Sequence, residues 1–306
     1  MNKIDKMLLE KVSSLHDIKL GAFNIRKNGE VVERKSTKEI EIVPKKDKKG
    51  IDIIIKPNVQ NKAVHIPVII TAGGLNDLVY NDFYVGENSY VTIVAGCGIH
   101  NTSDDNSTHN GIHSFHLEKN SHVKYIERHV GMGKGEGGKI LNPTTKIYQK
   151  ENSILEIETL QLGGVTKSDR KTFANLGENA QLNIQENILT ENAETAKTSF
   201  KVTLKGKNSK VEVVSHSVAK GESYQEFKSN LIGKNECFGH VECDGILLNN
   251  ARIVSVPMID ALSSDASLVH EAAIGKIAGD ELIKLMTLGL SEEEAEDVII
   301  KGFLMG

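Results

Sequence analysis

The sequence predicts a mainly β protein, a right-handed parallel β-helix (a solenoid) with a short N-terminal helix and a small C-terminal helical segment. Two observations predict this fold: a turn-and-strand unit that recurs six times, and a nearly constant period. Each unit begins with a charged residue and an Asn, and these Asn residues are Asn88, Asn120, Asn152, Asn179, Asn208 and Asn235. They are separated by 32, 32, 27, 29 and 27 residues. A period near 30 residues is typical of solenoids, in which each coil covers the hydrophobic edge of its neighbour.

The unit itself has a physical explanation. Asn tolerates the left-handed backbone region and hydrogen-bonds its own backbone, so a charged residue followed by Asn favours a turn. The apolar residues three and five positions after the Asn alternate with polar residues, as in a strand with one buried face. Ordinary antiparallel hairpins are the alternative, but they need no fixed phase. We therefore expect the six Asn residues to stack at one corner of successive coils.

Composition excludes several classes of protein. The 306 residues are 39% hydrophobic, which suffices for a large core, and the net charge of -4 gives no basic footprint for nucleic acid. No apolar run approaches the roughly 18 residues that span a bilayer. The N-terminus has no signal-peptide core, and three cysteines do not form a disulfide framework. We expect no nucleic-acid or membrane partner, and a reducing cytoplasmic compartment.

The chain divides into three expected regions. Residues 1–80 hold an amphipathic helix over residues 1–16 and then a strand-rich lead-in. The β-helix core follows over residues 81–258. In residues 259–306 the apolar period changes from 2 to 3.6, which predicts two short helices.

Each C-terminal helix has its own boundary signal. The first, over residues 279–289, ends at Gly289. Ser291 and Glu294 form a capping box that opens the second. Two helices after a solenoid are expected to form a terminal cap, a docking surface, or both.

Cys97 is the first candidate functional residue. It lies between Gly96 and Gly98, which we expect to leave the sulfur partly exposed and open to another molecule. Six of the eleven histidines fall between His100 and His129. Cys97, His100, His109 and His113 offer the donor types of a metal site, but their spacing matches no tight zinc pattern. We therefore interpret the histidines alone as solvated loop residues.

Cys243, His270 and Glu271 form a second candidate group. A thiol, an imidazole and a carboxylate make a plausible ligand set for iron or an iron–sulfur cluster, and a structural His-Glu pair is the alternative. Cys97 and Cys243 occupy nearly the same phase five repeats apart. At about 4.8 Å per coil they lie on the order of 24 Å apart, too far to share one metal. We expect an upper site at Cys97 and a lower site at Cys243.

The glycine-rich run at residues 133–140 nearly matches a phosphate-binding loop. Ile140 stands where Ser or Thr must hold magnesium, and no strand and long helix flank the run. We interpret it as a flexible loop and expect the chain to bind no nucleotide.

Four segments near the C-terminus form a specific pattern: residues 269–277, 280–283, 289–295 and 299–303. This pattern resembles the SufB/SufD family of iron–sulfur cluster assembly scaffold proteins, densely over about residues 240–304 and more thinly upstream to about residue 80. The short chain is similar to the minimal SufB-like forms. The Gln and Trp that follow the first cysteine in the family have no counterpart at residues 126–131.

The resemblance implies roles for particular residues. Cys97 is similar to the family cysteine that takes up persulfide sulfur, and Lys146 to a lysine implicated in sulfur transfer. Cys243 resembles the second functional cysteine, and His270 with Glu271 resembles the ligand-bearing His-Glu pair. His100 remains a weaker candidate ligand beside Cys97.

The resemblance also implies a function. The expected protein is not an enzyme but a scaffold that receives sulfur and iron and builds a transient iron–sulfur cluster, 4Fe–4S in type. A SufC-like ABC-type ATPase is expected to dock on residues 280–304, and a cysteine desulfurase or other sulfide source to supply sulfur. A single such subunit is expected to form a homodimer through the C-terminal end of the β-helix.

Two other functions are weighed against the scaffold. One is a non-catalytic SufD-like structural subunit, which should lack the cysteine–histidine set. The other is a solenoid enzyme acting on carbohydrate, for which the sequence shows no facing pair of acidic residues in phase.

Overall fold

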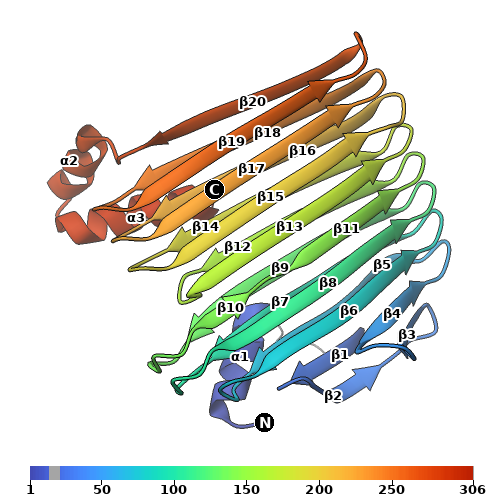
Figure 1. Cartoon of the computed structure of the whole chain (residues 1–306), viewed down its shortest axis with the longest axis horizontal. Coiled ribbons are helices and arrows are strands. Elements are labelled where there is room, and N and C mark those ends of the chain that lie inside the picture. Colours follow the sequence, from blue (N-terminus) through green and yellow to red (C-terminus); the bar gives the residue numbers. More distant parts are fainter. Residues whose placement is uncertain (14–20, 306) are drawn as a thin grey trace.

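The computed structural model describes residues 1–13 and 21–305, and within them two sheets, parallel except for one antiparallel pair at the N-terminal edge of each, enclose one elongated interior (Figure 1). Sheet A has the order β2-β1-β5-β7-β9-β12-β14-β16-β18-β20. Sheet B has the order β19-β17-β15-β13-β10-β8-β6-β4-β3, with β11 also pairing with β8 and β13. From β5 onward the chain alternates between the sheets and advances one strand at each return. The predicted β-solenoid is confirmed.

The strands of sheet A are β1 (Ala22–Lys27), β2 (Glu30–Lys35), β5 (Gln60–Ile70), β7 (Tyr90–His100), β9 (His122–Met132), β12 (Ile154–Leu162), β14 (Gln181–Thr190), β16 (Ser209–Ala219), β18 (Cys237–Leu247) and β20 (Ala266–Gly275). Those of sheet B are β3 (Ile40–Pro44), β4 (Gly50–Ile55), β6 (Asn76–Val85), β8 (Ser107–Leu117), β10 (Lys139–Leu141), β11 (Thr144–Gln149), β13 (Lys167–Leu176), β15 (Thr195–Leu204), β17 (Tyr224–Gly233) and β19 (Arg252–Ala261). The helices are α1 (Lys3–Ser13), α2 (Gly279–Thr287) and α3 (Glu292–Met305). Strand β20 lies within the region expected to be helical, so the solenoid continues to Gly275.

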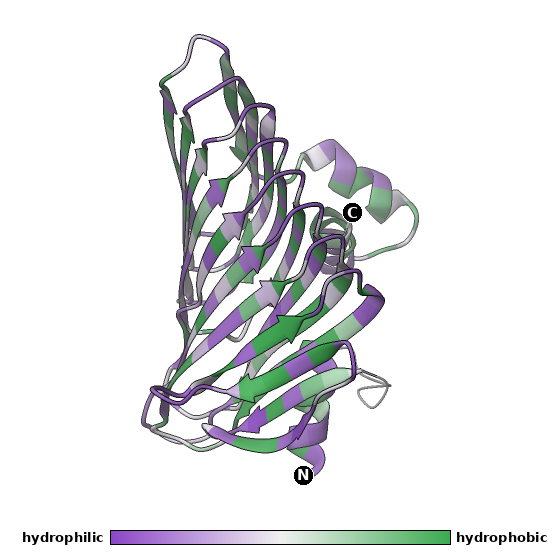
Figure 2. Ribbon diagram, turned by 90° about the vertical axis from the view of Figure 1, so that its right-hand side faces the viewer, coloured by the Kyte–Doolittle hydropathy of each residue, from purple (hydrophilic) through white to green (hydrophobic). Residues whose placement is uncertain are grey.

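The core is built from register columns, sets of residues that face one another on successive strands. Apolar and polar residues alternate along most strands (Figure 2), and the apolar ones are the buried ones. One column in sheet A is Ile93, Tyr125, Ile157, Ile184, Val213 and Val241. All six are buried in one cluster. Burying such a side chain contributes about 1.5–3 kcal/mol, so columns of this kind hold the coils together.

The repeated Asn residues form a ladder at one corner of the solenoid. Asn88, Asn120, Asn152, Asn179 and Asn208 have φ between 52° and 58°, in the left-handed region. Each side-chain amide donates to the carbonyl oxygen of the preceding Asn, over 2.9–3.3 Å. The ladder also includes Asn58, where the repeat pattern is too weak to see in the sequence. The stacking prediction is confirmed for five of the six positions. At the sixth, the side chain of Asn235 instead accepts from the backbone N–H of Glu236.

Replacing Asn152 by alanine should lower the free energy of unfolding by about 1–2 kcal/mol, because alanine is strained in the left-handed region. The change also removes the hydrogen bonds to Asn120 and Asn179. Asn152→Gly should cost less, since glycine adopts this conformation freely. Asn235→Ala is the matched control, and urea unfolding measures all three. An equal loss in Asn152→Ala and Asn235→Ala would contradict a stabilising role for the ladder.

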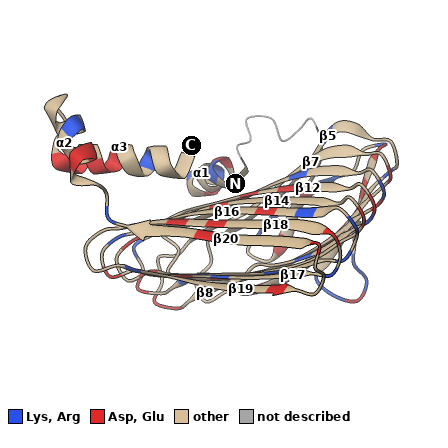
Figure 3. Ribbon diagram, turned by 90° about the horizontal axis from the view of Figure 1, so that it is seen from above, with Lys and Arg blue, Asp and Glu red and all other residues tan. Residues whose placement is uncertain are grey.

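All three helices lie on the outer side of sheet A (Figure 3). Helix α1 packs over β5, β7 and β9 through Leu8, Leu9 and Val12. The predicted N-terminal helix is therefore confirmed, although Leu15 lies outside the described residues. No helix in the described chain is long and apolar enough to cross a membrane.

The two C-terminal helices differ in how they contact the solenoid. Helix α3 packs on β14 and β16, burying Ile300 and Leu304 against Val218. Its capping box is confirmed: Ser291 N donates to Glu294 Oε2 over 2.8 Å, and Glu294 N to Ser291 Oγ over 3.2 Å. Helix α2 has no buried residue, and its Ile283 and Met286 side chains are exposed.

Candidate functional site

Cys97 is buried in the solenoid interior, with only 1% of its surface exposed. Gly96 and Gly98 have the opposite phase on β7 and lie under α1. An added Cβ on Gly96 would lie 2.8 Å from the carbonyl oxygen of Val12, and one on Gly98 would lie 3.0 Å from Leu8 Cδ2. The expected exposed thiol is therefore wrong: the glycines make room for the helix. Burial and the charge of Asp77 raise the pKa of Cys97 well above its usual range, so the thiol is neutral at pH 7.

Three histidines surround the same interior space. His109 and His113 on β8, and His129 on β9, are buried, so the interpretation of these residues as solvated loop histidines is wrong. They line a small cavity together with Cys97 and Glu127. The remaining candidate, His100, is the last residue of β7 and has the outward phase, so it lies apart from the Cys97 sulfur.

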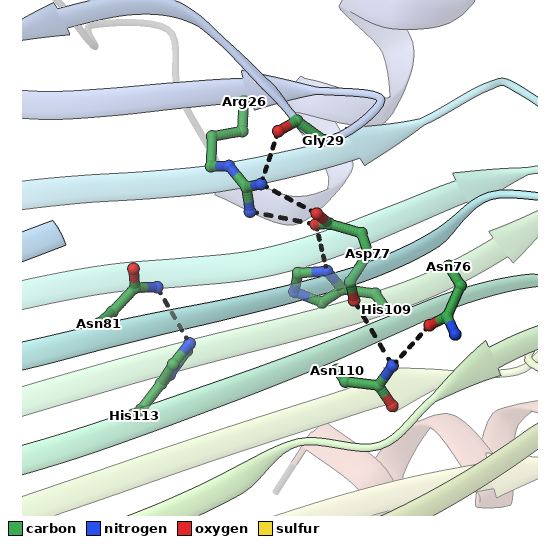
Figure 4. A network of polar contacts seen from close by, with 8 residues as sticks. All are labelled: Arg26, Gly29, Asn76, Asp77, Asn81, His109, Asn110 and His113. Atoms are coloured by element: carbon green, nitrogen blue, oxygen red, sulfur yellow. Dashed lines mark hydrogen bonds and ion pairs between the residues drawn. The ribbon is translucent and has the colours of Figure 1, made fainter. Parts of the chain in front are cut away.

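An ion pair fixes the first of these histidines (Figure 4). Arg26 on β1 binds both carboxylate oxygens of Asp77, over 2.9 and 3.0 Å. The other contact of Asp77 is with His109, whose Nδ1 lies 3.0 Å from Oδ2. Burial alone would raise the pKa of Asp77, but the hydrogen bond from His109 and the charge of Arg26 lower it to about 2. Asp77 is therefore an ionised hydrogen-bond acceptor.

A second buried network lies deeper in the solenoid and is centred on Arg170 of β13. Arg170 binds Glu127 through Nη1, His129 Nδ1 through Nη2 at 2.9 Å, and Glu186 Oε2 through Nε at 3.3 Å. Burial acts to raise the pKa of Glu127, but the charge of Arg170 overrides it and holds that pKa far below its usual range. Burial raises the pKa of Glu186 despite the same arginine. The buried charges of Arg170 and Glu127 therefore compensate one another inside the solenoid.

The lower candidate site lies at the C-terminal end of the same interior. Cys243 on β18 is fully buried and hydrogen-bonds the Ser255 side chain on β19. His270 on β20 lies between two hydroxyls, with Nδ1 2.9 Å from Ser229 Oγ and Nε2 3.4 Å from Ser255 Oγ. Burial raises the pKa of Cys243 to about 11, partly offset by Ser255, and burial lowers the pKa of His270. The structure therefore brings Cys243 and His270 together through Ser255.

Two other predicted site residues lie elsewhere. Glu271 has the opposite phase to His270, and its side chain is 68% exposed on the outer face of sheet A, 3.9 Å from His240 Nε2. Lys146 faces solvent on β11 of sheet B, so it does not meet Cys97. The sequence could place these residues in the right coils, but neighbouring positions on one strand point to opposite sides.

A polar register column connects the two buried cysteine regions. Starting beside Cys97 and ending at the lower site, its members are Glu127, Thr159, Glu186, Ser215 and Cys243. All five are buried, and we call them the interior polar column. Each lies seven or eight residues after the Asn of its repeat, so aligning the repeats in the sequence would have predicted this column. Ser229 and Ser255 were also missed, because serine in a strand carries no signal of its own.

The two cysteines lie in different coils, as predicted. They lie on β7 and β18, five strands apart in sheet A, and both face the interior. The glycine-rich run at 133–140 leads into β10 rather than a helix, so it is not built as a phosphate-binding loop.

Comparison with known proteins identifies the fold's family. Residues 78–303 match the model of the SufBD core domain of the SUF system for iron–sulfur cluster assembly. The chain belongs to the SufBD family. Because the match covers most of the solenoid and α3, the buried cysteines and the interior polar column all lie within a SufBD core.

Several curated SufBD proteins align with this chain. A SufBD family protein of Methanothermobacter thermautotrophicus is 31% identical over 231 residues, which cover 74% of this chain and 54% of that relative. One from Pyrococcus horikoshii is 26% identical over 290 residues, covering 92% of this chain and 81% of the relative. One from Methanocaldococcus jannaschii is 27% identical over 255 residues, covering 82% and 79%. The chain thus spans about half of the first relative and most of the other two.

Proposed function

We propose that this SufBD protein is a scaffold subunit that receives sulfur and iron and builds a nascent iron–sulfur cluster, 4Fe–4S in type. The observation that carries the proposal is the interior polar column, which links the space around Cys97 to Cys243. An ordinary solenoid core would place apolar residues at these positions, because burying polar groups costs free energy unless they are paired. A polar interior between two cysteines supports movement of a small polar cargo from one to the other.

The proposed roles follow from the positions of the side chains. Cys97 receives sulfur, which must arrive through the interior or after local opening of the wall, since the thiol is enclosed. Cys243 and His270 bind iron at the lower end, where binding displaces the thiol proton. Glu271, on the outer face, takes up iron from solvent. Lys146 faces outward on sheet B and would act there, towards a docked sulfur donor such as a cysteine desulfurase.

A non-catalytic SufD-like subunit remains the alternative function. Such a subunit needs no reactive groups inside its solenoid. Here Cys97, Cys243 and His270 face one interior, which favours the scaffold.

Anaerobic reconstitution with ferrous iron and sulfide tests the proposal. Cys243→Ser should abolish the cluster absorbance and the Mössbauer signal, because iron loses its thiolate ligand. Cys237→Ser is the matched control, since it removes another buried cysteine from the same strand. Cluster content in Cys243→Ser equal to that of the control would refute the proposed lower site.

We further propose that a SufC-like ATPase docks on α2 and α3 and supplies the ATP hydrolysis. Helix α2 exposes Ile283 and Met286, and Leu288 at its C-terminal cap has 79% of its surface accessible. Such apolar exposure on one short helix favours a protein interface.

Charging this surface should separate the two proteins. Ile283→Glu with Leu288→Glu is expected to abolish co-purification with the ATPase while leaving the solenoid intact, because α2 contributes nothing buried. Val31→Glu with Val32→Glu, at exposed positions on β2, is the control. Undiminished binding by the α2 variant would place the docking surface elsewhere.

A further inference from the structure

The cavity beside Cys97 is small, and a glycine forms part of its lining. It has a volume of about 10 Å³, room for about one water-sized species such as a metal ion. Gly111 lies on β8 between His109 and His113, with the same inward phase. An added Cβ on Gly111 would lie 3.1 Å from His113 Nε2 and 3.3 Å from His109 Nε2. Two imidazole nitrogens therefore border one gap, which exists because residue 111 has no side chain.

Hydrogen bonding assigns the protons on His113. Its Nδ1 lies 2.7 Å from the hydroxyl oxygen of Tyr125, and that hydroxyl donates its only proton to Glu127 over 3.0 Å. The Tyr125 oxygen can then only accept, so His113 Nδ1 carries the proton and Nε2 carries the lone pair. The amide nitrogen of Asn81, 3.4 Å from Nε2, is compatible with this tautomer.

The same argument applies to His109. Its Nδ1 lies 3.0 Å from Oδ2 of Asp77, and both oxygens of that carboxylate accept from Arg26, so in the neutral ring Nδ1 carries the proton and the lone pair is on Nε2. Metal-binding histidines have this arrangement: one nitrogen is fixed by a carboxylate or another acceptor, and the other is free for the metal. Both lone pairs border the Gly111 gap, although the one on His113 accepts from the amide nitrogen of Asn81, which a bound metal must displace.

A second and independent observation points to a ligand. Asn81 lines this cavity, and its side-chain oxygen is buried and has no hydrogen-bond partner among the described residues; its amide nitrogen, and not this oxygen, faces His113 (Figure 4). Leaving a buried acceptor unsatisfied costs about 1–3 kcal/mol. Cys97 lines the same cavity from the opposite sheet. The space thus offers two imidazoles, a thiol and a free amide oxygen.

We propose that the Gly111 gap binds one divalent transition-metal ion through Nε2 of His109 and Nε2 of His113, with Cys97 and Asn81 completing the ligand set. Imidazole and thiolate donors favour borderline ions such as Fe²⁺, Co²⁺ or Zn²⁺ over Mg²⁺ and Ca²⁺. In the described chain no three His, Cys, Asp or Glu side chains already converge as a metal site. Binding therefore requires the Asn81 amide to rotate, so that its oxygen replaces its nitrogen beside His113, and Cys97 to move towards the two histidines by a change of rotamer.

This site does not depend on the proposed assembly function. Its Cys97 lies five strands from Cys243 in sheet A, and its other ligands come from β6 and β8 in the N-terminal half of the solenoid. Metal binding there is measurable without sulfide, ATPase or cluster formation.

Anaerobic titration with Co²⁺ tests the site, using the full chain in a Cys243→Ser, His270→Gln background that disables the lower site. Bound cobalt should give ligand-field bands and a sulfur-to-cobalt charge-transfer band. Gly111→Ala should weaken binding by at least about 100-fold, more than is usual for loss of an outer partner of a ligand. It keeps every ligand but fills the gap. His116→Ala, on the same strand but facing outward, is the control and should bind as the background protein does.

His113→Gln provides the second variant, because it keeps much of the side-chain volume. It should weaken binding as Gly111→Ala does, and Cys97→Ser should remove the charge-transfer band. Circular dichroism and thermal melting check folding; if Gly111→Ala misfolds, His113→Gln decides. Absence of Co²⁺ binding in the background protein, unchanged affinity in a folded Gly111→Ala or His113→Gln, or an equal loss in His116→Ala would overturn the proposal.

Discussion

Replacing Arg170 by leucine is expected to lower the free energy of unfolding by about 3–5 kcal/mol at neutral pH, the usual cost of breaking a buried ion pair from one side. Arg170 is enclosed between sheets A and B and contacts both Glu127 and Glu186. Leucine fills part of the space but leaves the Glu127 carboxylate without its main counter-charge. The neighbouring His129 also loses the hydrogen bond that Arg170 donates to its Nδ1.

The pH dependence of this loss is a sharper test than its size. In the wild-type protein the folded-state pKa of Glu127 is depressed, so its contribution to stability is present above the unfolded value of about 4.3 and is lost only on acidification. Without Arg170, burial raises that pKa above the unfolded value. The variant's penalty should then already be present near pH 4, where wild-type Glu127 is still ionised, and should grow further as pH rises towards neutrality.

Chemical unfolding at several pH values between 4 and 8 measures the effect. Lys167→Leu is the matched control, because Lys167 lies on the same strand but is exposed. It should change stability by less than about 1 kcal/mol at every pH. A penalty for Arg170→Leu that is independent of pH would mean that lost packing, and not an uncompensated carboxylate, causes the destabilisation.

The sequence predicted the solenoid because its turn chemistry is local. A left-handed Asn followed by alternating apolar residues needs no tertiary contact to be recognised, and the period counts the coils. The wrong predictions concern which way side chains point, into the interior or out of it. Gly96 and Gly98 were expected to expose Cys97. However, Val91, Ile93, Cys97 and Ile99 all face the interior, as the alternation along the strand already indicated. The glycines have the other phase and face α1, a contact between segments that no local pattern encodes.

The candidate sites were predictable only in part for the same reason. Cys97 and Cys243 were placed correctly in separate coils, because the coil number follows from the repeat. Their partners were not, because they come from facing strands: His109 and His113 from β8, and Ser255 from β19. Such pairs depend on how sheet B is aligned with sheet A across the interior. The interior polar column was the exception, since its members share one sheet and one phase.

The lower site lies beside an open end of the solenoid. Among the described residues β20 and β19 are the last strands of sheets A and B, so each leaves one edge unpaired. Met258, Ile259, Leu262, Val269 and Ile274 expose apolar surface there. Helices α2 and α3 do not cover this end, because they lie beside the outer face of sheet A (Figure 3). Proteins normally pair or cover such edges, and we propose that a second copy of this chain does so.

A charge in this edge strand should therefore separate the two copies. Val269→Lys is expected to convert a homodimer into a monomer, because charged residues on an edge strand oppose strand pairing. Val32→Lys is the matched control, an exposed valine on β2, the edge strand at the other end of sheet A. Light scattering measures the mass of each protein, with and without the ATPase.

Cluster content after reconstitution should fall together with dimerisation. A two-fold axis at this end would bring Cys243 and His270 of each copy towards one interface, so each copy would supply part of the ligand set. Val269→Lys should then lose cluster nearly as completely as Cys243→Ser, although its own Cys243 and His270 are intact. A wild-type protein that is monomeric with its ATPase present would rule out the homodimer. A monomeric Val269→Lys with full cluster content would instead show that one chain suffices to build the lower site.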